Sequence, residues 1–376
     1  MVKNVVNSKR IIGAIAILIF INLRIFSTLL WGNDNKRSNI YKIGEIGKNV
    51  LYEHKELFYC ISGICCDELN NIYVIDTGYN KIFKFTPDGK IIGAFGHEGQ
   101  NYGQFLGSRR LDQRLRMSMG NDDKLYIMDG GNKRILVYSC SGEIINQRNY
   151  QSDFVLDIPA VNKRGDVYIL SRNGMKLIDK FNSHFKYETS IFEFSKHYQF
   201  PIEMPLIPKQ IFRFPNDMDI IKLISRNDLL VVISNYSLKA YVYNNENKLI
   251  NEFSLLTNSF KTDFTKKLDK LKEVNNKIAY ISKGTSKRFV GSFIAPFKAF
   301  IDKNNYICLA YSTNDNKTIL TKYGLDGKLN EEYVFNDLTE IGFITSNNEG
   351  DIIISRDNST KIEIYRFKNN KEEVLK

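Results

Sequence analysis

Residues 61–105 read ISGICCDELNNIYVIDTGYNKIFKFTPDGKIIGAFGHEGQNYGQF. The stretch contains four short apolar runs, SGICC, IYVID, KIFKF and KIIGAF, which are separated by turns rich in Asn, Asp, Gly and Pro. Runs of about five residues rich in Ile, Val, Tyr and Phe, bounded by such turn residues, are typical of β-strands joined by tight turns. The stretch therefore predicts a four-stranded antiparallel meander.

This four-run unit recurs along the chain. Counterparts of IYVID, each with an Asn, Asp or Gly turn before it, lie at 122–130, 165–172, 227–235, 304–312 and 349–357. Counterparts of KIFKF, each ending on an aromatic residue and followed by a hairpin signal, lie at 134–138, 176–181, 238–243, 318–323 and 361–367. Repetition of a supersecondary unit indicates a repeat architecture, and four-stranded sheets arranged radially form a β-propeller. We therefore predict an all-β fold, a six-bladed β-propeller of four-stranded antiparallel blades, over residues 41–376.

A propeller must join its first and last blades, and two segments could supply the joining strand. Residues 41–47, YKIGEIG, precede the first full unit and are similar to its fourth run, so they could form the outermost strand of the last blade. Residues 371–376, KEEVLK, could occupy the same place. Either strand would cover an edge that otherwise presents unpaired backbone groups.

The chain begins with a basic segment, 1–10, followed by an apolar segment, 11–31. An apolar stretch of about 20 residues can cross a bilayer, and no convincing cleavage site of small residues follows this one. We expect an uncleaved transmembrane helix or, as the alternative, a cleaved signal that would make the protein secreted. Lys3, Lys9 and Arg10 favour a cytoplasmic tail at 1–10, which makes the protein single-pass in the cell membrane with an extracytoplasmic propeller.

The first two copies share a set of residues beyond their hydrophobic rhythm. These are 74–76, 78–80, 81–82 and 103–105 in the first copy, and Asp129, Gly131, Asn132 and 134–135 in the second. The pattern of Val-x-Asp, a Gly/Asn turn, an Arg/Lys-Ile strand and a Gly-Gln-Phe loop resembles the NHL repeat. The resemblance is specific over 61–138 and implies a six-bladed propeller of the NHL kind. It implies no single function, because NHL modules bind proteins or RNA and related propellers include lyases and hydrolases.

Two aspartates recur in one turn context, Asp76 and Asp129. Aspartate in such Gly/Asn turns accepts hydrogen bonds from nearby backbone N–H groups. We therefore interpret both as residues that hold a turn rather than as catalytic acids.

Arginines gather where the repeat is interrupted. In a meander, the turn between the second and third strands lies on the same face as the link to the next blade, so this face should combine several basic side chains. The candidate ligand-binding residues are Arg109, Arg110, Arg114, Arg116, Arg172 and Arg356. Guanidinium groups at this density could bind a carboxylate or phosphate, and they could equally pair with acids of the loop such as Asp112.

A basic insertion separates the fourth and fifth copies. Within about 256–290, apolar residues recur at helical spacing with lysines between them, which predicts an amphipathic helix. Its candidate surface-binding residues are Lys266, Lys267, Lys270 and Lys277. The helix could contact an anionic surface, or it could pack on the propeller with its lysines in solvent.

Composition limits the remaining classes of function. The net charge of +11 comes mainly from 1–40 and 261–288, and a basic face over the whole domain is missing, which disfavours nucleic acid as a partner. The five cysteines are too scattered for a disulfide framework, and no Cys or His cluster has metal-ligand spacing, so we expect no metal and no cofactor.

These features favour a membrane-anchored, monomeric binding scaffold without catalytic residues, whose partner is an unknown protein or an anionic cell-surface ligand. The alternative is a propeller hydrolase or lyase with its site at the mouth of the central channel. A second alternative is a nucleic-acid-binding NHL module.

Overall fold

The computed structural model describes residues 40–47, 50–108, 114–150, 158–170, 176–193, 221–226, 228–234, 239–255, 257, 297–313, 317–336, 338–356 and 359–367. Residues Asn39–Lys376 form one compact unit. The segment 11–31 lies outside the described residues, as does the insertion predicted at 256–290 apart from Thr257. Among the residues that are described, no helix is long and apolar enough to span a bilayer.

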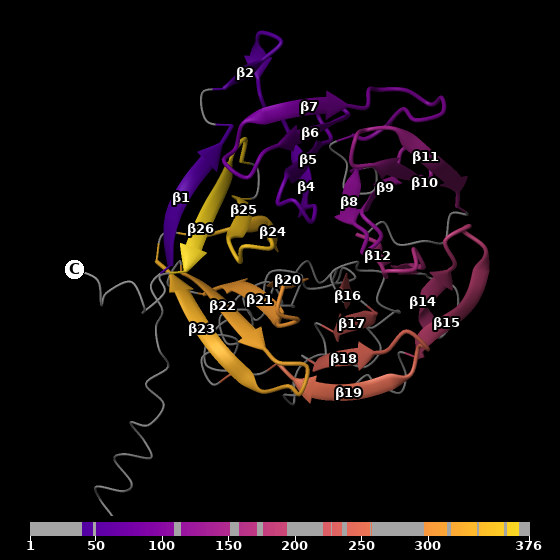
Figure 1. The fold of residues 1–376 in the computed structure, drawn as a ribbon, viewed down its shortest axis with the longest axis vertical. Coiled ribbons are helices and arrows are strands. Elements are labelled where there is room, and N and C mark those ends of the chain that lie inside the picture. Colours follow the sequence, from indigo (N-terminus) through magenta and orange to yellow (C-terminus); the bar gives the residue numbers. More distant parts are fainter. Residues whose placement is uncertain are drawn as a thin grey trace, which may run out of the picture. The chain divides into compact units, whose positions relative to one another are not determined.

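Six four-stranded antiparallel sheets are arranged around a central channel, as the sequence predicts (Figure 1). Blade 1 consists of β4 (Ile61–Cys66), β5 (Ile72–Asp76), β6 (Lys81–Phe85) and β7 (Ile91–Phe95). Blade 2 consists of β8 (Arg116–Met119), β9 (Lys124–Asp129), β10 (Arg134–Ser139) and β11 (Ile144–Asn149). Blade 3 consists of β12 (Ala160–Val161), β13 (Val167–Leu170), β14 (Lys176–Phe181) and β15 (Tyr187–Glu193). Blade 4 consists of β16 (Ile221–Arg226), β17 (Leu229–Ser234), β18 (Lys239–Tyr243) and β19 (Leu249–Ser254). Blade 5 consists of β20 (Phe297–Ile301), β21 (Ile307–Ser312), β22 (Thr318–Tyr323) and β23 (Leu329–Phe335). Blade 6 consists of β24 (Ile341–Ser346), β25 (Ile352–Arg356), β26 (Ile362–Phe367) and β1 (Ile40–Ile46), and a short hairpin, β2 (Leu51–Tyr52) and β3 (Lys55–Glu56), precedes blade 1.

The propeller closes through its first strand. β1 pairs antiparallel with β26, from Ile40 opposite Phe367 to Ile46 opposite Ile362. The prediction that 41–47 forms the outermost strand of the last blade is therefore confirmed, while 371–376 lies outside the described residues. The register also places Tyr365 opposite Ile352, so Tyr365 rather than the strand-terminal Phe367 corresponds to Phe85 of blade 1.

Each middle strand is buried on both sides because every blade packs between two others. All five residues of β5 are buried. Ile72 and Val74 pack in a cluster with Ile353 and Ile362 of blade 6, whereas the alternate residues Tyr73 and Ile75 pack with blade 2. Side chains of successive strand residues point to opposite faces, so this alternation explains why the second runs are apolar throughout.

The inner hairpins, which join the first and second strands of a blade, share one backbone conformation. In five of them a residue has a positive φ: Asn70, Asp123, Gly165, Asn305 and Gly350. Glycine and asparagine adopt this left-handed conformation at the lowest cost, which accounts for the turn signals in the sequence. These hairpins form one end of the central channel.

Candidate functional site: the central channel and its mouth

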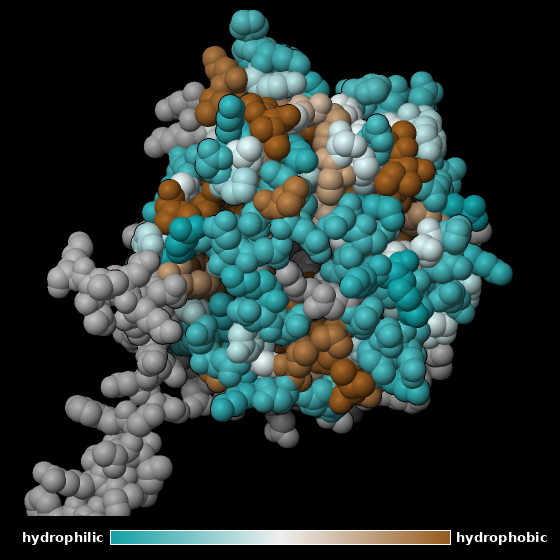
Figure 2. All heavy atoms as spheres, viewed as in Figure 1, coloured by the Kyte–Doolittle hydropathy of each residue, from teal (hydrophilic) through white to brown (hydrophobic). Residues whose placement is uncertain are grey.

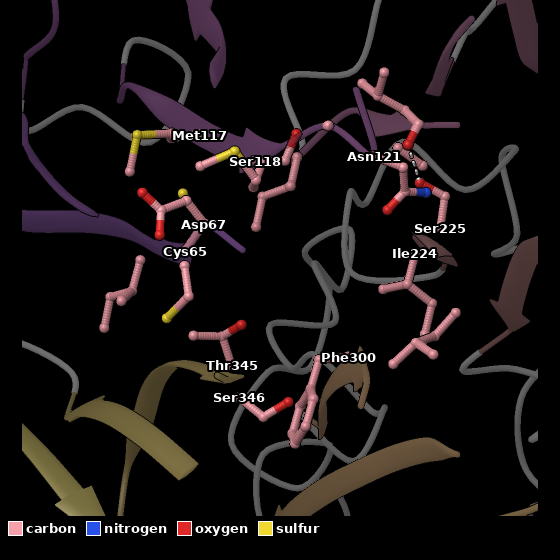
Figure 3. Close-up of a pocket in the computed structure, with 18 of the residues that line it drawn as sticks. Cys65, Asp67, Met117, Ser118, Asn121, Ile224, Ser225, Phe300, Thr345 and Ser346 are labelled. Carbon is pink, nitrogen blue, oxygen red and sulfur yellow. Dashed lines mark hydrogen bonds between the residues drawn. The ribbon is translucent and has the colours of Figure 1, made fainter. Parts of the chain in front are cut away.

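A cavity of about 280 Å³ occupies the central channel. The first strands of all six blades contribute to its wall, among them β4 through Cys65, β8 through Met117 and β24 through Thr345 (Figure 3). Each first strand is the inner edge of its sheet and pairs on only one side. The wall is therefore assembled from the whole ring, so its shape depends on closure of the propeller.

The cavity lies toward the inner-hairpin end of the channel. Its lining includes the second halves of the first strands and the hairpin residues 67–68, 120–121 and 347–348. Asp76 instead lies opposite Ile61, at the start of β4. The face predicted to bind a ligand, which carries the turns after the second strands, is thus at the other end of the blades.

Hydroxyl groups of the wall differ in whether they have a partner. The Ser118 hydroxyl donates to the carbonyl of Pro159 at 2.8 Å, and the Ser225 hydroxyl donates to the carbonyl of Val161 at 2.6 Å. Both bonds join blade 3 to a neighbouring blade, and Figure 3 shows the one made by Ser225. In contrast, Ser346 is 8% exposed, and its buried Oγ has no hydrogen-bond partner among the described residues.

Carboxylates surround the mouth of the cavity on blades 1 and 2. Asp67 is buried and accepts hydrogen bonds from the Asn71 side chain at 2.8 Å and from the Tyr73 hydroxyl at 3.0 Å. Glu68 and Asp123 line the same cavity and are exposed. Burial, followed by the charges of Glu68 and Asp67, raises the pKa of Asp123 above its ordinary value. The mouth is therefore a region of negative potential in a chain whose net charge is +11.

The cysteines of the wall are not activated nucleophiles. Burial raises the pKa of both Cys65 and Cys66, so both are thiols at neutral pH, and the thiol is the unreactive form. All five cysteines are free, and of these Cys65 and Cys308 are buried while the others are half-buried. Within the described part of the chain, no group of His, Cys, Asp and Glu side chains could hold a metal ion.

Asp76 holds a turn, as the sequence predicts. Its Oδ2 accepts hydrogen bonds from the backbone N–H groups of Tyr59 and Cys60 at 2.7 and 2.9 Å. Its Oδ1 accepts from the N–H groups of Gly78 and Tyr79 at 2.8 and 3.0 Å. The carboxylate thus fastens the segment that enters blade 1 to the turn that follows β5.

Asp129 does the same for blade 2 with the help of Arg134. Asp129 accepts from the N–H of Leu106 at 3.2 Å and from Arg134 Nε at 3.3 Å. The Arg134 guanidinium is buried and also donates to the carbonyls of Gln100, Asn101 and Gln104 at 2.7–3.0 Å. The Gly-rich loop 97–105 is therefore folded around one arginine.

The predicted arginine set is only partly within the described residues. Arg109, Arg110 and Arg172 lie outside them, as do Lys266, Lys267, Lys270 and Lys277 of the predicted helix. Arg114 has a buried Nε without a hydrogen-bond partner among the described residues, and Arg116 donates to the carbonyl of Leu115 at 3.2 Å. Arg356 pairs with Glu363 at 3.0 Å. Anion binding by this set stays a prediction.

Sequence reasoning did not select the mouth carboxylates. Asp67, Glu68 and Asp123 fall in segments that the sequence marks as turns, and acidic residues are common in turns. A usable signal was nevertheless present, because the first two inner hairpins, DELNN and GNDDK, contain four acids and one lysine.

The geometry defines the class of protein: the chain is a six-bladed β-propeller. Similar solved structures include a protein of Bacteroides fragilis inferred to be exported, with 10% identity, a TM-score of 0.53, and coverage of 90% of this chain and 98% of that one. Others are a streptogramin B lyase (13% identity, TM-score 0.45, 84% and 81% covered) and the WD40 propeller of Doa1 (10%, 0.44, 83% and 80%). At these identities the similarity shows the fold alone. No family model matches the chain, and no curated protein matches it.

Proposed function

We propose that this protein is a membrane-anchored, extracytoplasmic and monomeric β-propeller that acts as a non-catalytic binding platform, with the channel mouth as its ligand site. The observation that supports it is the cavity walled by all six blades, open beside three carboxylates. Concave sites of this kind are where proteins bury small ligands or the ends of larger ones. Figure 2 shows hydrophilic residues around the centre of the ring on the side in view, with hydrophobic residues in separate patches.

The anchor half of the proposal rests on the sequence. The apolar segment 11–31 is long enough to span a bilayer, and the basic residues of 1–10 favour the cytoplasmic side. An experiment can use Glu246, which is exposed on the outer hairpin of blade 4. In wall-stripped intact cells, a Glu246→Cys variant should react with a membrane-impermeant maleimide much faster than the wild-type protein, whose five free cysteines are buried or half-buried. Labelling only after lysis would refute an extracytoplasmic propeller.

The binding half can be tested at Leu69, which is 78% exposed and adjoins Glu68 at the mouth. A photoreactive residue at position 69 should form adducts with the bound ligand in intact cells. The matched control position is Ile145, which is 47% exposed on an outer strand of blade 2. Equal adduct formation at both positions would contradict a ligand site at the channel mouth.

We propose the predicted basic surfaces as secondary contacts of this platform. Replacing Lys266, Lys267, Lys270 and Lys277 with Gln should weaken association with membranes or with an acidic partner, because such contacts depend on positive charge. The readout is co-sedimentation with vesicles containing anionic lipid, with neutral vesicles as the control. Unchanged sedimentation would remove the helix from the proposal.

A further inference from the structure

Three blades neutralise the acid of their inner hairpin with a basic side chain from near the end of the third strand. In blade 3, Lys180 Nζ lies 3.1 Å from Asp166. In blade 6, the Arg366 guanidinium makes two hydrogen bonds to Asp351, at 2.7 and 2.8 Å. In blade 5, Lys322 Nζ lies 3.5 Å from the Asp302 carboxylate. In each case the positive charge comes from within the same blade.

Blades 1 and 2, which supply the acids at the cavity mouth, lack this arrangement. Lys84 occupies the equivalent position in blade 1, but its Nζ donates to the carbonyl of Cys140 at 3.1 Å. The equivalent residue in blade 2 is the buried Val137. Within the described residues, no cation lies within ion-pair distance of Asp67, Glu68 or Asp123. Among the described residues of the lining, the exposed Lys163 is the one basic side chain, set against three carboxylates.

The wall next to these acids contains a second unsatisfied group. Ser346 belongs to blade 6, whose inner hairpin is bonded to that of blade 1: Asn348 donates to Asn70 Oδ1 at 2.7 Å and to the carbonyl of Glu68 at 3.0 Å. The Ser346 hydroxyl lines the cavity, is buried and has no hydrogen-bond partner in the part of the chain that the structure describes. Buried polar groups are normally hydrogen-bonded, so an orphan hydroxyl in a cavity wall indicates a missing acceptor or donor.

We infer that the channel mouth binds a small cationic ligand, an organic amine, whose ammonium group takes the place of the missing third-strand cations opposite Asp67, Glu68 and Asp123, while its polar atoms reach Ser346. This inference rests on the proposed ligand site and adds the chemical class of the ligand. A cavity of about 280 Å³ restricts the ligand to a small molecule or to a single side chain of a larger one. Of the three carboxylates only Asp67 is buried, and burial strengthens its attraction for a cation relative to bulk water.

The test compares three probes with five-carbon chains and different charges: cadaverine, a dication; pentanediol, which is neutral; and glutarate, a dianion. Binding to the full-length protein in detergent is measured by calorimetry at low salt. Cadaverine should bind, and its affinity should fall as salt is added, because screening weakens exposed charge pairs. Pentanediol and glutarate should bind much more weakly.

Two variants locate the site. Glu68→Gln combined with Asp123→Asn should weaken cadaverine binding by about tenfold, since each exposed pair contributes up to about 1 kcal/mol. The matched control is Glu246→Gln, which also removes a carboxylate from an exposed hairpin. Ser346→Ala should weaken binding without lowering the unfolding temperature, because the hydroxyl it removes bonds to none of the residues that the structure describes.

The outcomes separate this inference from the proposed function. If pentanediol or glutarate binds as tightly as cadaverine, or if the double variant binds cadaverine like the wild type, the cationic class is wrong. Adducts at position 69 would then still support the mouth as a ligand site. If position 69 gives no specific adducts, and every variant binds cadaverine as tightly as the Glu246→Gln control does, both the cationic class and the ligand site at the channel mouth are wrong.

Discussion

In this propeller, single side chains each make several hydrogen bonds to backbone groups. Asp76 satisfies four N–H groups with two oxygens, and Arg134 satisfies three carbonyls with one guanidinium. Both residues are buried and lie where the chain passes between blades. Aspartate and arginine in such turns look like catalytic residues in a sequence, and only the recurrence of Asp76 at Asp129 indicates their structural role.

Removal of the Asp76 carboxylate should destabilise the protein strongly. In Asp76→Ala, four N–H groups of a partly buried turn lose their acceptor. An unsatisfied buried group costs about 1–3 kcal/mol, and water entering the turn would restore part of this. We expect a loss of about 3 kcal/mol in the free energy of unfolding, measured by urea denaturation followed by circular dichroism. Asp88→Ala, at an exposed hairpin position of the same blade, should change the stability little. Equal effects of the two variants would contradict the structural role of Asp76.

Arg134→Lys should loosen the loop 97–105 while leaving the rest of the blade folded. Lysine can still pair with Asp129, but it lacks the planar fork that donates to three carbonyls at once. Amide exchange of Gly99 and Phe105, whose N–H groups bond within the loop, should accelerate in the variant. Arg148→Lys, on an exposed position of β11, is the control and should leave exchange unchanged. Unaltered protection of the loop in Arg134→Lys would show that the guanidinium does not hold it.

The second and third strands of each blade were predictable from the sequence, because each is a short apolar run that ends at a turn residue. The hairpin of β2 and β3 was not predicted. The closing strand β1 was predictable as one of two possibilities, since 41–47 has the rhythm of an outer strand. What decides between them is pairing across more than 300 residues, as between Ile40 and Phe367, and no local pattern encodes such a contact.

An ion-pair network spans this closing ladder. Glu363 of β26 is buried and pairs with Lys42 of β1, Lys361 and Arg356, while Glu45 of β1 pairs with Lys42 and Lys361. Charges from both chain ends therefore meet at the seam. Because Glu363 is removed from water, its partners are needed to keep it ionised.

Acid should weaken the seam, because Glu363 must stay ionised to keep its ion pairs. Burial raises the pKa of Glu363, but hydrogen bonds from Arg356 and Lys42 outweigh this and lower the pKa from 4.5 to about 2. A pKa lower in the folded than in the unfolded state adds stability above pH 4.5, and this contribution is lost as the pH falls toward 2.

The difference in unfolding temperature between the wild type and Glu363→Gln should therefore be largest near neutral pH and should shrink through that interval. Glu143→Gln, which alters an exposed carboxylate of blade 2, is the control and should show no such pH dependence. A difference that is constant with pH would mean that Glu363 acts through packing and not through its charge.

For the whole molecule, the ring could be predicted but the end of the channel that holds the cavity could not. The Gly-rich loop and its arginines led us to predict a ligand site at the end of the channel opposite the cavity. The structure shows that Arg134 instead holds much of this loop through hydrogen bonds to its carbonyls. The mouth lies at the other end because the inner strands there leave space that side chains do not fill. Residual space depends on how six first strands converge, and a sequence specifies each strand without specifying the gap between them.

Closure by β1 gives the last prediction. A chain beginning at residue 39 should fold with a cooperative transition, since Asn39–Lys376 is one compact unit. A chain beginning at residue 48 should unfold at a temperature lower by roughly 10 °C or more, because β26 loses its partner strand and Ile362 and Ile364 lose cover. A synthetic peptide of residues 40–47 should restore part of the loss by pairing with β26, and a scrambled peptide should not. If the shorter chain melts like the longer one, another segment such as 371–376 must be able to close the ring, and the ladder between β1 and β26 would not be what holds the two chain ends together.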